Sequence, residues 1–178
     1  LSDTEVKIIE KFRGNLQLVA ISKALSMHME FKLNKKVLTL HDAVEPKKVK
    51  VKDISCTPEV RNIGYFGSLY LGRGIDIILS MAKKMPQFVF HVFGGNEDQI
   101  KNLDKLDNVR FYGHIQASSV LEKLSEMDLL LMPYQKKIIV SDGKTDTSRW
   151  MSPMKMFEYM ASGVPIISSN LPVLREVL

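Results

Sequence analysis

From residue 61 onward, short apolar runs alternate with longer stretches in which apolar residues recur every three or four positions. The short runs predict strands, and the longer stretches predict helices. Most of the connections between them are short, and parallel strands joined by helices form right-handed crossovers. The alternation therefore predicts an α/β fold built on a doubly wound parallel sheet.

The expected elements fall into two groups. Upstream, helices are predicted at 4–12 and 23–31, with strands at 16–21 and 36–40, and we interpret residues 1–44 as one unit. Residues 45–60 are polar, rich in lysine and interrupted by proline, which predicts a linker. In residues 61–178, strands are predicted at 63–66, 88–93, 109–112, 129–133 and 164–168, and helices at 74–84, 98–106, 118–127, 153–162 and 172–178. Because the chain begins and ends within predicted helices, we expect a piece of a longer protein, truncated at the C-terminus of its second unit.

Composition excludes several kinds of protein. No apolar run approaches the roughly 18 residues needed to cross a bilayer, and the single cysteine, Cys56, excludes an internal disulfide and favours a cytoplasmic protein. The net charge of +5 admits either a basic face for anionic lipid or nucleic acid, or simply solvated lysines around a linker. No aromatic residue is interleaved with these lysines, so nucleic acid is not an expected partner. The lysines around the linker are Lys35, Lys36, Lys47, Lys48, Lys50 and Lys52.

Ligands of doubly wound sheets bind at the carboxyl ends of the strands, so the loops there are the candidate site. The loop after the first strand of the second unit contains Gly67, Ser68, Gly72, Arg73 and Gly74. Its glycines would let backbone amides approach a ligand, and Arg73 would add a positive charge. The spacing matches neither a dinucleotide-binding fingerprint nor a P-loop.

The helix predicted at 153–162 is bounded on both sides. Ser152 is a suitable N-cap, Pro153 suits the first helical position, and Gly163 ends the helix. Its N-terminus forms a candidate anion site, to which Lys155 would add a charge. Lys155 and Glu158 could instead form a surface ion pair worth about 0.2–0.5 kcal/mol. With phosphates at the helix start, however, Glu158 lies one turn deeper, where it could accept bonds from ribose hydroxyls, which predicts a nucleoside-diphosphate pocket.

The histidines suggest no metal site, because their spacing fits none. His91 lies within an apolar strand and is interpreted as a core residue. His114 follows a strand, where its backbone could meet the edge of a base or form only a turn. No Ser/His/Asp or Cys/His arrangement is visible, so the catalytic residues are unknown.

The segment SPMKMFEYMASGVPII resembles the signature of the family-four, or group 1, glycosyltransferases of the GT-B fold. Further similarity covers nearly the whole chain, at 63–68, 73–74, 111–114, 128–133, 19–23 and 38–46. The resemblance implies a retaining, hexosyltransferase-like transfer of sugar from a nucleotide-diphospho-sugar, in bacterial surface polysaccharide or glycoconjugate synthesis. Residues 61–178 would be the Rossmann-like donor domain, and residues 1–44 a remnant of the N-terminal acceptor domain.

The resemblance also implies roles for individual residues. The donor phosphates would be bound by Gly67, Ser68, Arg73, Ser152 and Lys155, the ribose by Glu158, and the base by the backbone at His114 and Ile115. No cofactor or metal is expected. A saccharide or lipid-linked acceptor would bind through the missing N-terminal domain, without which the fragment would be inactive. The full-length protein would be cytoplasmic, with peripheral association at the inner face of the membrane as an option.

Two positions depart from the family pattern. Ser68 stands where an arginine is usual, and Trp150 stands where a glutamate normally contacts the donor sugar. These departures leave two alternatives to the transferase: a non-catalytic nucleotide-sugar-binding or assembly domain, and a GT-B-type sugar-nucleotide epimerase.

Overall fold

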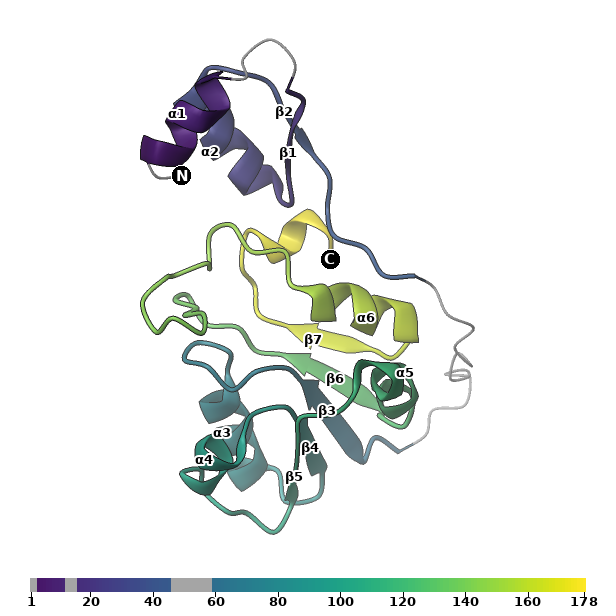
Figure 1. Cartoon of the computed structure of the whole chain (residues 1–178). Helices are drawn as coiled ribbons and strands as arrows, with labels where there is room; N and C mark the ends of the chain where they lie inside the picture. The colour runs from purple at the N-terminus through teal and green to yellow at the C-terminus, as the bar shows by residue number, and fades with distance from the viewer. Residues whose placement is uncertain (1–2, 12–15, 46–58) are drawn as a thin grey trace.

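A computed structural model describes residues 3–11, 16–45 and 59–178 of the chain. Its main body is a five-stranded parallel sheet with the strand order β5-β4-β3-β6-β7 (Figure 1). The chain runs outward from β3 to one edge, then crosses back to β6 and runs to the other edge. This confirms the predicted doubly wound α/β fold. The strands are β3 (Asn62–Phe66), β4 (Val89–Phe93), β5 (Val109–Gly113), β6 (Leu129–Met132) and β7 (Ile166–Ser168).

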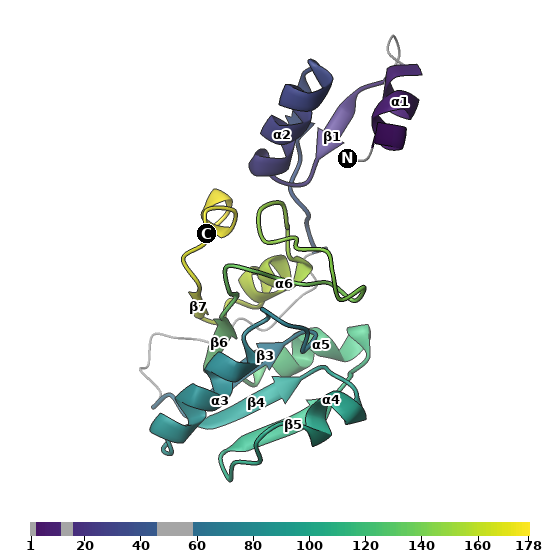
Figure 2. The same cartoon turned by 90° about the vertical axis from the view of Figure 1, so that its left-hand side faces the viewer.

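Helices cover both faces of this sheet because alternate strand residues point to opposite sides (Figure 2). On one face, Tyr65 and Val92 pack with apolar residues of α3 (Ile75–Lys84) and α4 (Glu97–Lys101). On the other, Phe66 packs with α5 (Ala117–Ser125) and α6 (Met154–Ser162). Two apolar cores therefore fix the strand ends from which the candidate site is built.

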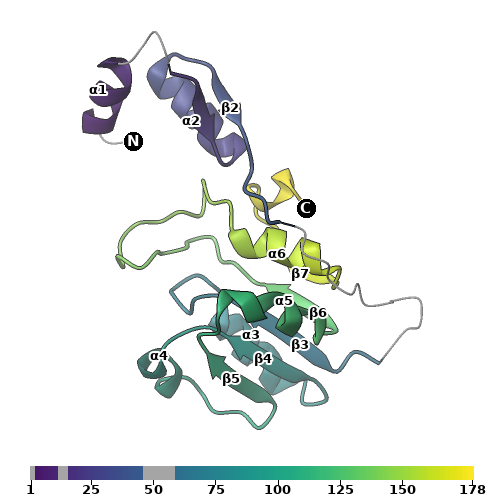
Figure 3. The ribbon, with the colours of Figure 1, turned by 45° about the vertical axis from the view of Figure 1, so that its right-hand side comes forward.

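The N-terminal segment forms a small unit that lies apart from the five-stranded sheet (Figure 3). It contains α1 (Asp3–Lys11), β1 (Leu18–Ala20), α2 (Lys23–Leu33) and β2 (Val37–Thr39), and β1 pairs in parallel with β2. Its own core is formed by Ala20, Met29, Leu33 and Val37. Most of the predicted linker, residues 46–58 with Cys56, lies outside the described residues.

Two helix predictions are wrong. The helix expected at 98–106 is the shorter α4, because a capping box at Asn96 and Gln99 starts it early and it ends at Lys101, with Asn102 as the C-cap. The helix expected at 172–178 is a single 3₁₀ turn, Leu174–Glu176, since Val177 already departs from helical geometry. Apolar periodicity over so few residues cannot distinguish such a turn from an α-helix.

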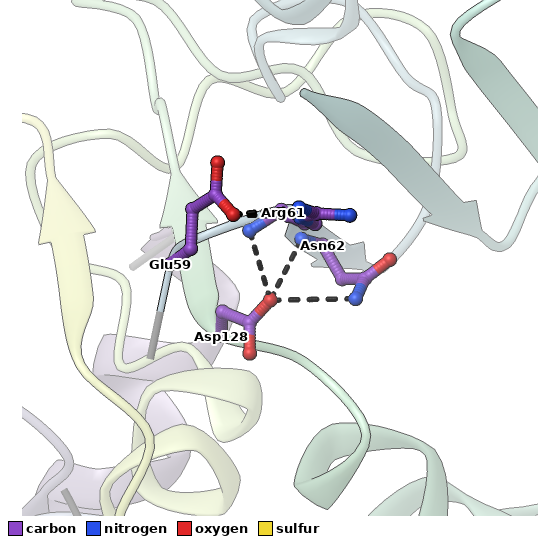
Figure 4. Close-up of polar contacts among 4 residues, drawn as sticks. All are labelled: Glu59, Arg61, Asn62 and Asp128. Atoms are coloured by element: carbon purple, nitrogen blue, oxygen red, sulfur yellow. Dashed lines mark hydrogen bonds and ion pairs between the residues drawn. The ribbon is translucent and has the colours of Figure 1, made fainter. Parts of the chain in front are cut away.

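Asp128 ties the beginning of β3 to the beginning of β6 (Figure 4). Its Oδ2 accepts hydrogen bonds from the backbone N–H of Arg61 at 3.0 Å, the backbone N–H of Asn62 at 2.8 Å and the side-chain amide of Asn62 at 3.3 Å. Arg61 also pairs with Glu59 across an N–O distance of 2.6 Å, an exposed contact that contributes little. The carboxylate of Asp128 thus links the two central strands at this end, beside the backbone hydrogen bond from the Asp128 N–H to the Asn62 carbonyl at 2.8 Å.

We expect Asp128→Ala to lower the free energy of unfolding by roughly 1–3 kcal/mol, because two backbone N–H groups lose their acceptor. Asp107→Ala is a matched control, since Asp107 lies in an exposed turn. Urea denaturation of both variants measures the difference. Equal losses of stability in the two variants would contradict the proposed link.

Candidate functional site

A pocket of about 490 Å³ opens at the carboxyl ends of the central strands. Loops after β3, β4 and β5 form most of its wall, and α6 closes one side. The lining contains six of the eight predicted site residues, namely Gly67, Ser68, His114, Ile115, Lys155 and Glu158. Parallel α/β sheets bind ligands where the strand order reverses, and β3 lies at that point here. The other lining residues are Phe66, Tyr70, Phe93, Gly94, Gly95, Asn96, Gln99 and Val120.

The loop from Gly67 to Gly74 approaches the side chain of Lys155 closely at Gly67. Gly67 has a φ of +152°, and a Cβ at this position would lie 2.7 Å from Lys155 Nζ. The Tyr65 hydroxyl donates a hydrogen bond to the Ser68 carbonyl at 2.8 Å, which holds the loop against the sheet. A side chain at this position would be strained by the positive φ and would displace the end of the Lys155 side chain, so glycine is favoured here.

Lys155 Nζ is buried between two aromatic rings and has no hydrogen-bond partner within the described chain. It lies 4.1 Å from the ring centre of Tyr65 and 4.8 Å from that of Tyr134. Burial, together with the nearby positive charge of Arg73, holds the pKa of Lys155 well below its usual range, while Glu158 acts in the opposite direction. An ammonium group in this position is ready to accept an anionic partner.

Arg73 completes a cluster of positive charge around Tyr134. Its Nη1 donates to the Tyr134 hydroxyl at 3.0 Å, and its Cζ lies 5.3 Å from the ring centre. The Arg73 Nε is buried and has no partner among the described residues. Arg73 does not line the pocket itself. Its positive charge therefore acts on the pocket from its position beside Tyr134.

The predicted N-cap role of Ser152 is wrong. The helix begins one residue later than expected, with Pro153 as its N-cap, so no side chain caps the first turn. The Ser152 hydroxyl is buried without a partner in the described chain and does not line the pocket. Pro153 is held in an extended conformation, with φ −77° and ψ 116°, which keeps Ser152 outside the helix.

Glu158 is half-buried and lines the pocket one helical turn beyond Lys155. The alternative of a surface Lys155–Glu158 ion pair is wrong: among the described residues neither side chain forms an ion pair. Lys155 instead points towards the tyrosine rings. The two charges thus stay separate, the positive one at the loop and the negative one farther along α6.

Three tyrosines that the sequence did not indicate support this arrangement. Tyr65 and Tyr134 enclose Lys155, and burial raises the pKa of both hydroxyls. The Tyr159 hydroxyl accepts a hydrogen bond from the Phe66 N–H at 2.7 Å and so attaches α6 to the end of β3. For Tyr65 and Tyr134, the available signal was a tyrosine within or shortly after a buried strand, whereas Tyr159 lies in α6 and had no such signal.

Two further residues clarify the predicted roles. His91 is half-buried and its ring nitrogens contact Asn62 Oδ1 at 3.1 Å and the Tyr112 hydroxyl at 2.8 Å, which agrees with a structural role. Trp150 does not line the pocket; its ring packs on His28 of the N-terminal segment, with ring centres 4.6 Å apart.

The described residues contain no cluster of three or more His, Cys, Asp or Glu side chains able to hold a metal ion. None of the described helices is long and apolar enough to span a bilayer.

The sequence of this chain is similar to those of known proteins. The family model described as "Glycosyl transferases group 1" matches residues 60–178. An uncharacterized 41.2 kDa protein in the cps region of Klebsiella pneumoniae is 27% identical over 120 residues, covering 66% of this chain and 30% of the relative. The putative teichuronic acid biosynthesis glycosyltransferase TuaH of Bacillus subtilis is 24% identical over 114 residues, covering 62% and 27%. The chain thus spans less than a third of the length of these relatives.

Solved structures share the fold at low identity. A mutant of S. aureus TarM in complex with fondaparinux, alpha-GlcNAc-glycerol and UDP superposes with a TM-score of 0.63 at 15% identity, covering 97% of this chain and 33% of that one. A glycosyltransferase from Rickettsia africae superposes with a TM-score of 0.65 at 13% identity, covering 97% and 49%.

Proposed function

We propose that this chain, which belongs to the group 1 glycosyl transferases, binds a nucleotide-diphospho-sugar in the pocket beside α6 and takes part in sugar transfer with retention. The observation that carries the proposal is the buried Lys155 ammonium, which has no partner in the described chain and lies beside the Gly67 loop. A buried charge without a partner is costly unless a ligand of opposite charge completes it. Two neighbouring phosphates are such a ligand.

The remaining roles follow from position. Lys155 and the amides of the Gly67–Ser68 loop would bind the diphosphate. Arg73, which is hydrogen-bonded to Tyr134, would add positive charge nearby. Glu158 would accept hydrogen bonds from the ribose, and the backbone at His114 and Ile115 would meet the base. Ser152 could reach the phosphates only by turning its free hydroxyl towards them. No cofactor or metal is required by this set of contacts.

In the transfer itself, the bond between the anomeric carbon and the phosphate oxygen breaks, and the nucleoside diphosphate leaves with a growing negative charge. The anomeric carbon forms a new bond to the oxygen of an acceptor hydroxyl, which gives up its proton. Lys155, Arg73 and the N-terminus of α6 would stabilise the charge of the leaving diphosphate. This contribution is electrostatic, so it assists departure of the leaving group without itself deciding the stereochemistry.

The setting we propose is bacterial surface polysaccharide synthesis. It is supported by the relatives, one from a cps region and one described for teichuronic acid biosynthesis. UDP in the TarM complex makes UDP the first nucleotide to test. Screening UDP-, GDP-, ADP- and dTDP-sugars by thermal shift then identifies the donor class.

Glu158→Ala is the direct test of the pocket. We expect it to weaken UDP binding by about tenfold, since a charged acceptor of ribose hydrogen bonds is lost. The wild type should also prefer UDP over 2′-deoxy-UDP, and the variant should not. Calorimetry measures both, with Glu122→Ala on the exposed side of α5 as the matched control. Unchanged UDP affinity in Glu158→Ala would reject the proposed ribose contact.

A second candidate, a non-catalytic nucleotide-sugar-binding domain, is favoured by Trp150. This residue replaces the sugar-contacting glutamate of the family pattern and packs on His28 instead of lining the pocket. Hydrolysis or transfer of a bound UDP-sugar would argue against this candidate, whereas binding without turnover would support it.

A further inference from the structure

Two adjoining cavities lie between the N-terminal segment and the loops after β6 and β7. One, of about 510 Å³, is lined by Lys136, Arg149 and Trp150 among others, and the second, of about 540 Å³, by Lys23 and Arg175. Pro172 and Glu176 line both cavities. We call these two cavities together the basic groove, which is lined by Lys23, Lys136, Arg149, Trp150, Arg175 and Glu176 among others. It shares no lining residue with the donor pocket.

Direct contacts hold the two walls of the basic groove together. The Ser22 hydroxyl donates to the Trp150 carbonyl at 3.0 Å, and the His28 ring packs against the Trp150 ring. The Glu176 carboxylate accepts hydrogen bonds from the backbone N–H groups of Lys23 at 2.6 Å and Ala24 at 3.0 Å. The groove is therefore built by residues from both segments.

Positive charge predominates in the groove. Among the described residues that line it, Glu176 is the single acidic one. Its carboxylate is already bound to the first amides of α2, a helix that has no acidic residue in its first turn. Within residues 3–11, 16–45 and 59–178, the four basic side chains of the groove form no ion pair. Their positive charge is thus available to a ligand.

We propose that the basic groove binds an acidic saccharide, whose rings carry carboxylate or phosphate groups, and that this saccharide is the acceptor of the transfer. The planar guanidinium of Arg149 matches both of these anions, and the partly exposed Trp150 ring adds an apolar surface. Each cavity has the size of a small-molecule site. The acceptor role rests on the proposed function, whereas binding of the acidic saccharide does not.

The position of the groove suits an acceptor. Trp150, which lines it, precedes Ser152 and the start of α6 by only a few residues, and Lys155 lies in the first turn of that helix. Through Trp150, the groove is therefore connected along the chain to the residues at the phosphate end of the donor pocket. An acceptor must approach the donor from that end, because the bond that breaks joins the sugar to the phosphate.

Calorimetry of this chain at low salt tests the proposal with trigalacturonate, its neutral methyl ester, maltotriose phosphate and trithymidylate. The test variant is Lys136→Gln with Arg149→Gln. The control is Lys84→Gln with Lys105→Gln, which removes the same charge near the amino ends of the strands. We expect either acidic sugar to bind more tightly than the ester, and the test variant alone to weaken binding about tenfold or more.

The proposal is overturned if neither acidic sugar binds, if the ester binds equally well, if trithymidylate binds more tightly, or if the control variant loses as much affinity as the test variant. UDP titrated into the same samples separates the two hypotheses. Absence of UDP binding with retained trigalacturonate binding contradicts the proposed function, and with it the acceptor role, but not saccharide binding in the groove. Retained UDP binding without trigalacturonate binding contradicts the groove alone.

Discussion

Lys155→Met is expected to weaken UDP binding by about 10- to 100-fold while making the folded chain more stable. The affinity falls because a hydrogen bond between charged groups is lost at the phosphates. The stability rises, by roughly 1–3 kcal/mol, because the wild type buries an ammonium without a hydrogen-bond partner and methionine does not. Methionine also keeps much of the apolar stem that packs between Tyr65 and Tyr134.

The lowered pKa of Lys155 predicts how pH changes the stability of the chain and its affinity for UDP. Its pKa is lowered in the folded chain, so between that value and the usual lysine pKa the unfolded chain binds more protons, and stability rises with pH. UDP binds the protonated amine and raises its pKa. Binding therefore takes up a proton, and affinity falls as pH increases through the pKa of Lys155 in the free protein.

Urea denaturation and calorimetry across this pH range check these expectations. Lys101→Met, an exposed position in the last turn of α4, serves as the control and should change neither quantity. Lys155→Met should abolish the rise of stability that the wild type shows over this range. A variant that is less stable than the wild type, or that binds UDP equally well, would contradict the interpretation of Lys155.

The sequence predicted the doubly wound parallel sheet because the signals for its strands and helices are local. Most strands of the main sheet are short and predominantly apolar. Glycine follows two of them, Gly67 after β3 and Gly94 after β4, and Gly163 and Pro165 precede β7. Parallel sheets buried on both faces require such runs. Boundaries failed where local signals were weakest, at the 3₁₀ turn after Pro172 and at the end of α4.

The candidate site was predicted in part for the same reason. Lys155 and Glu158 belong to one helix, so their spacing already separates them along its axis. The enclosure of Lys155 by Tyr65 and Tyr134 brings together three distant parts of the chain, and no local pattern indicates it. The contact between Glu176 and the start of α2 is equally remote in sequence. Ser152 had the right residue type for a cap, but Pro153 took that position.

Gly72→Ala is expected to produce the largest loss of stability in the loop that carries Arg73. Gly72 has a φ of +83°, and a Cβ there would lie 1.8 Å from the Lys137 carbonyl oxygen. Backbone atoms cannot yield as a flexible side chain can, so the loops on either side must separate. That movement would break two hydrogen bonds, Gln135 N–H to the Gly72 carbonyl at 2.9 Å and Ile139 N–H to the Leu71 carbonyl at 3.0 Å.

The loss should exceed roughly 3 kcal/mol of unfolding free energy, because strain and broken contacts add. Gly143→Ala is a close control: Gly143 also has a positive φ, +70°, but no atom lies within 4 Å of the added Cβ. It should lose only the roughly 1–2 kcal/mol that a left-handed alanine costs. Urea denaturation compares the two variants, and equal losses would show that Lys137 does not press on Gly72.

Gly72→Ala is expected to lower the affinity for UDP as well as the stability of the chain. Separation of the loops would move Arg73 away from the Tyr134 hydroxyl, its partner at 3.0 Å. It would also displace Ile138, which is buried in the wild type. UDP affinity of Gly72→Ala should therefore fall even where the variant remains folded, whereas Gly143→Ala should bind UDP as the wild type does. A folded Gly72→Ala variant with unchanged affinity would mean that the position of Arg73 does not matter to the bound phosphates.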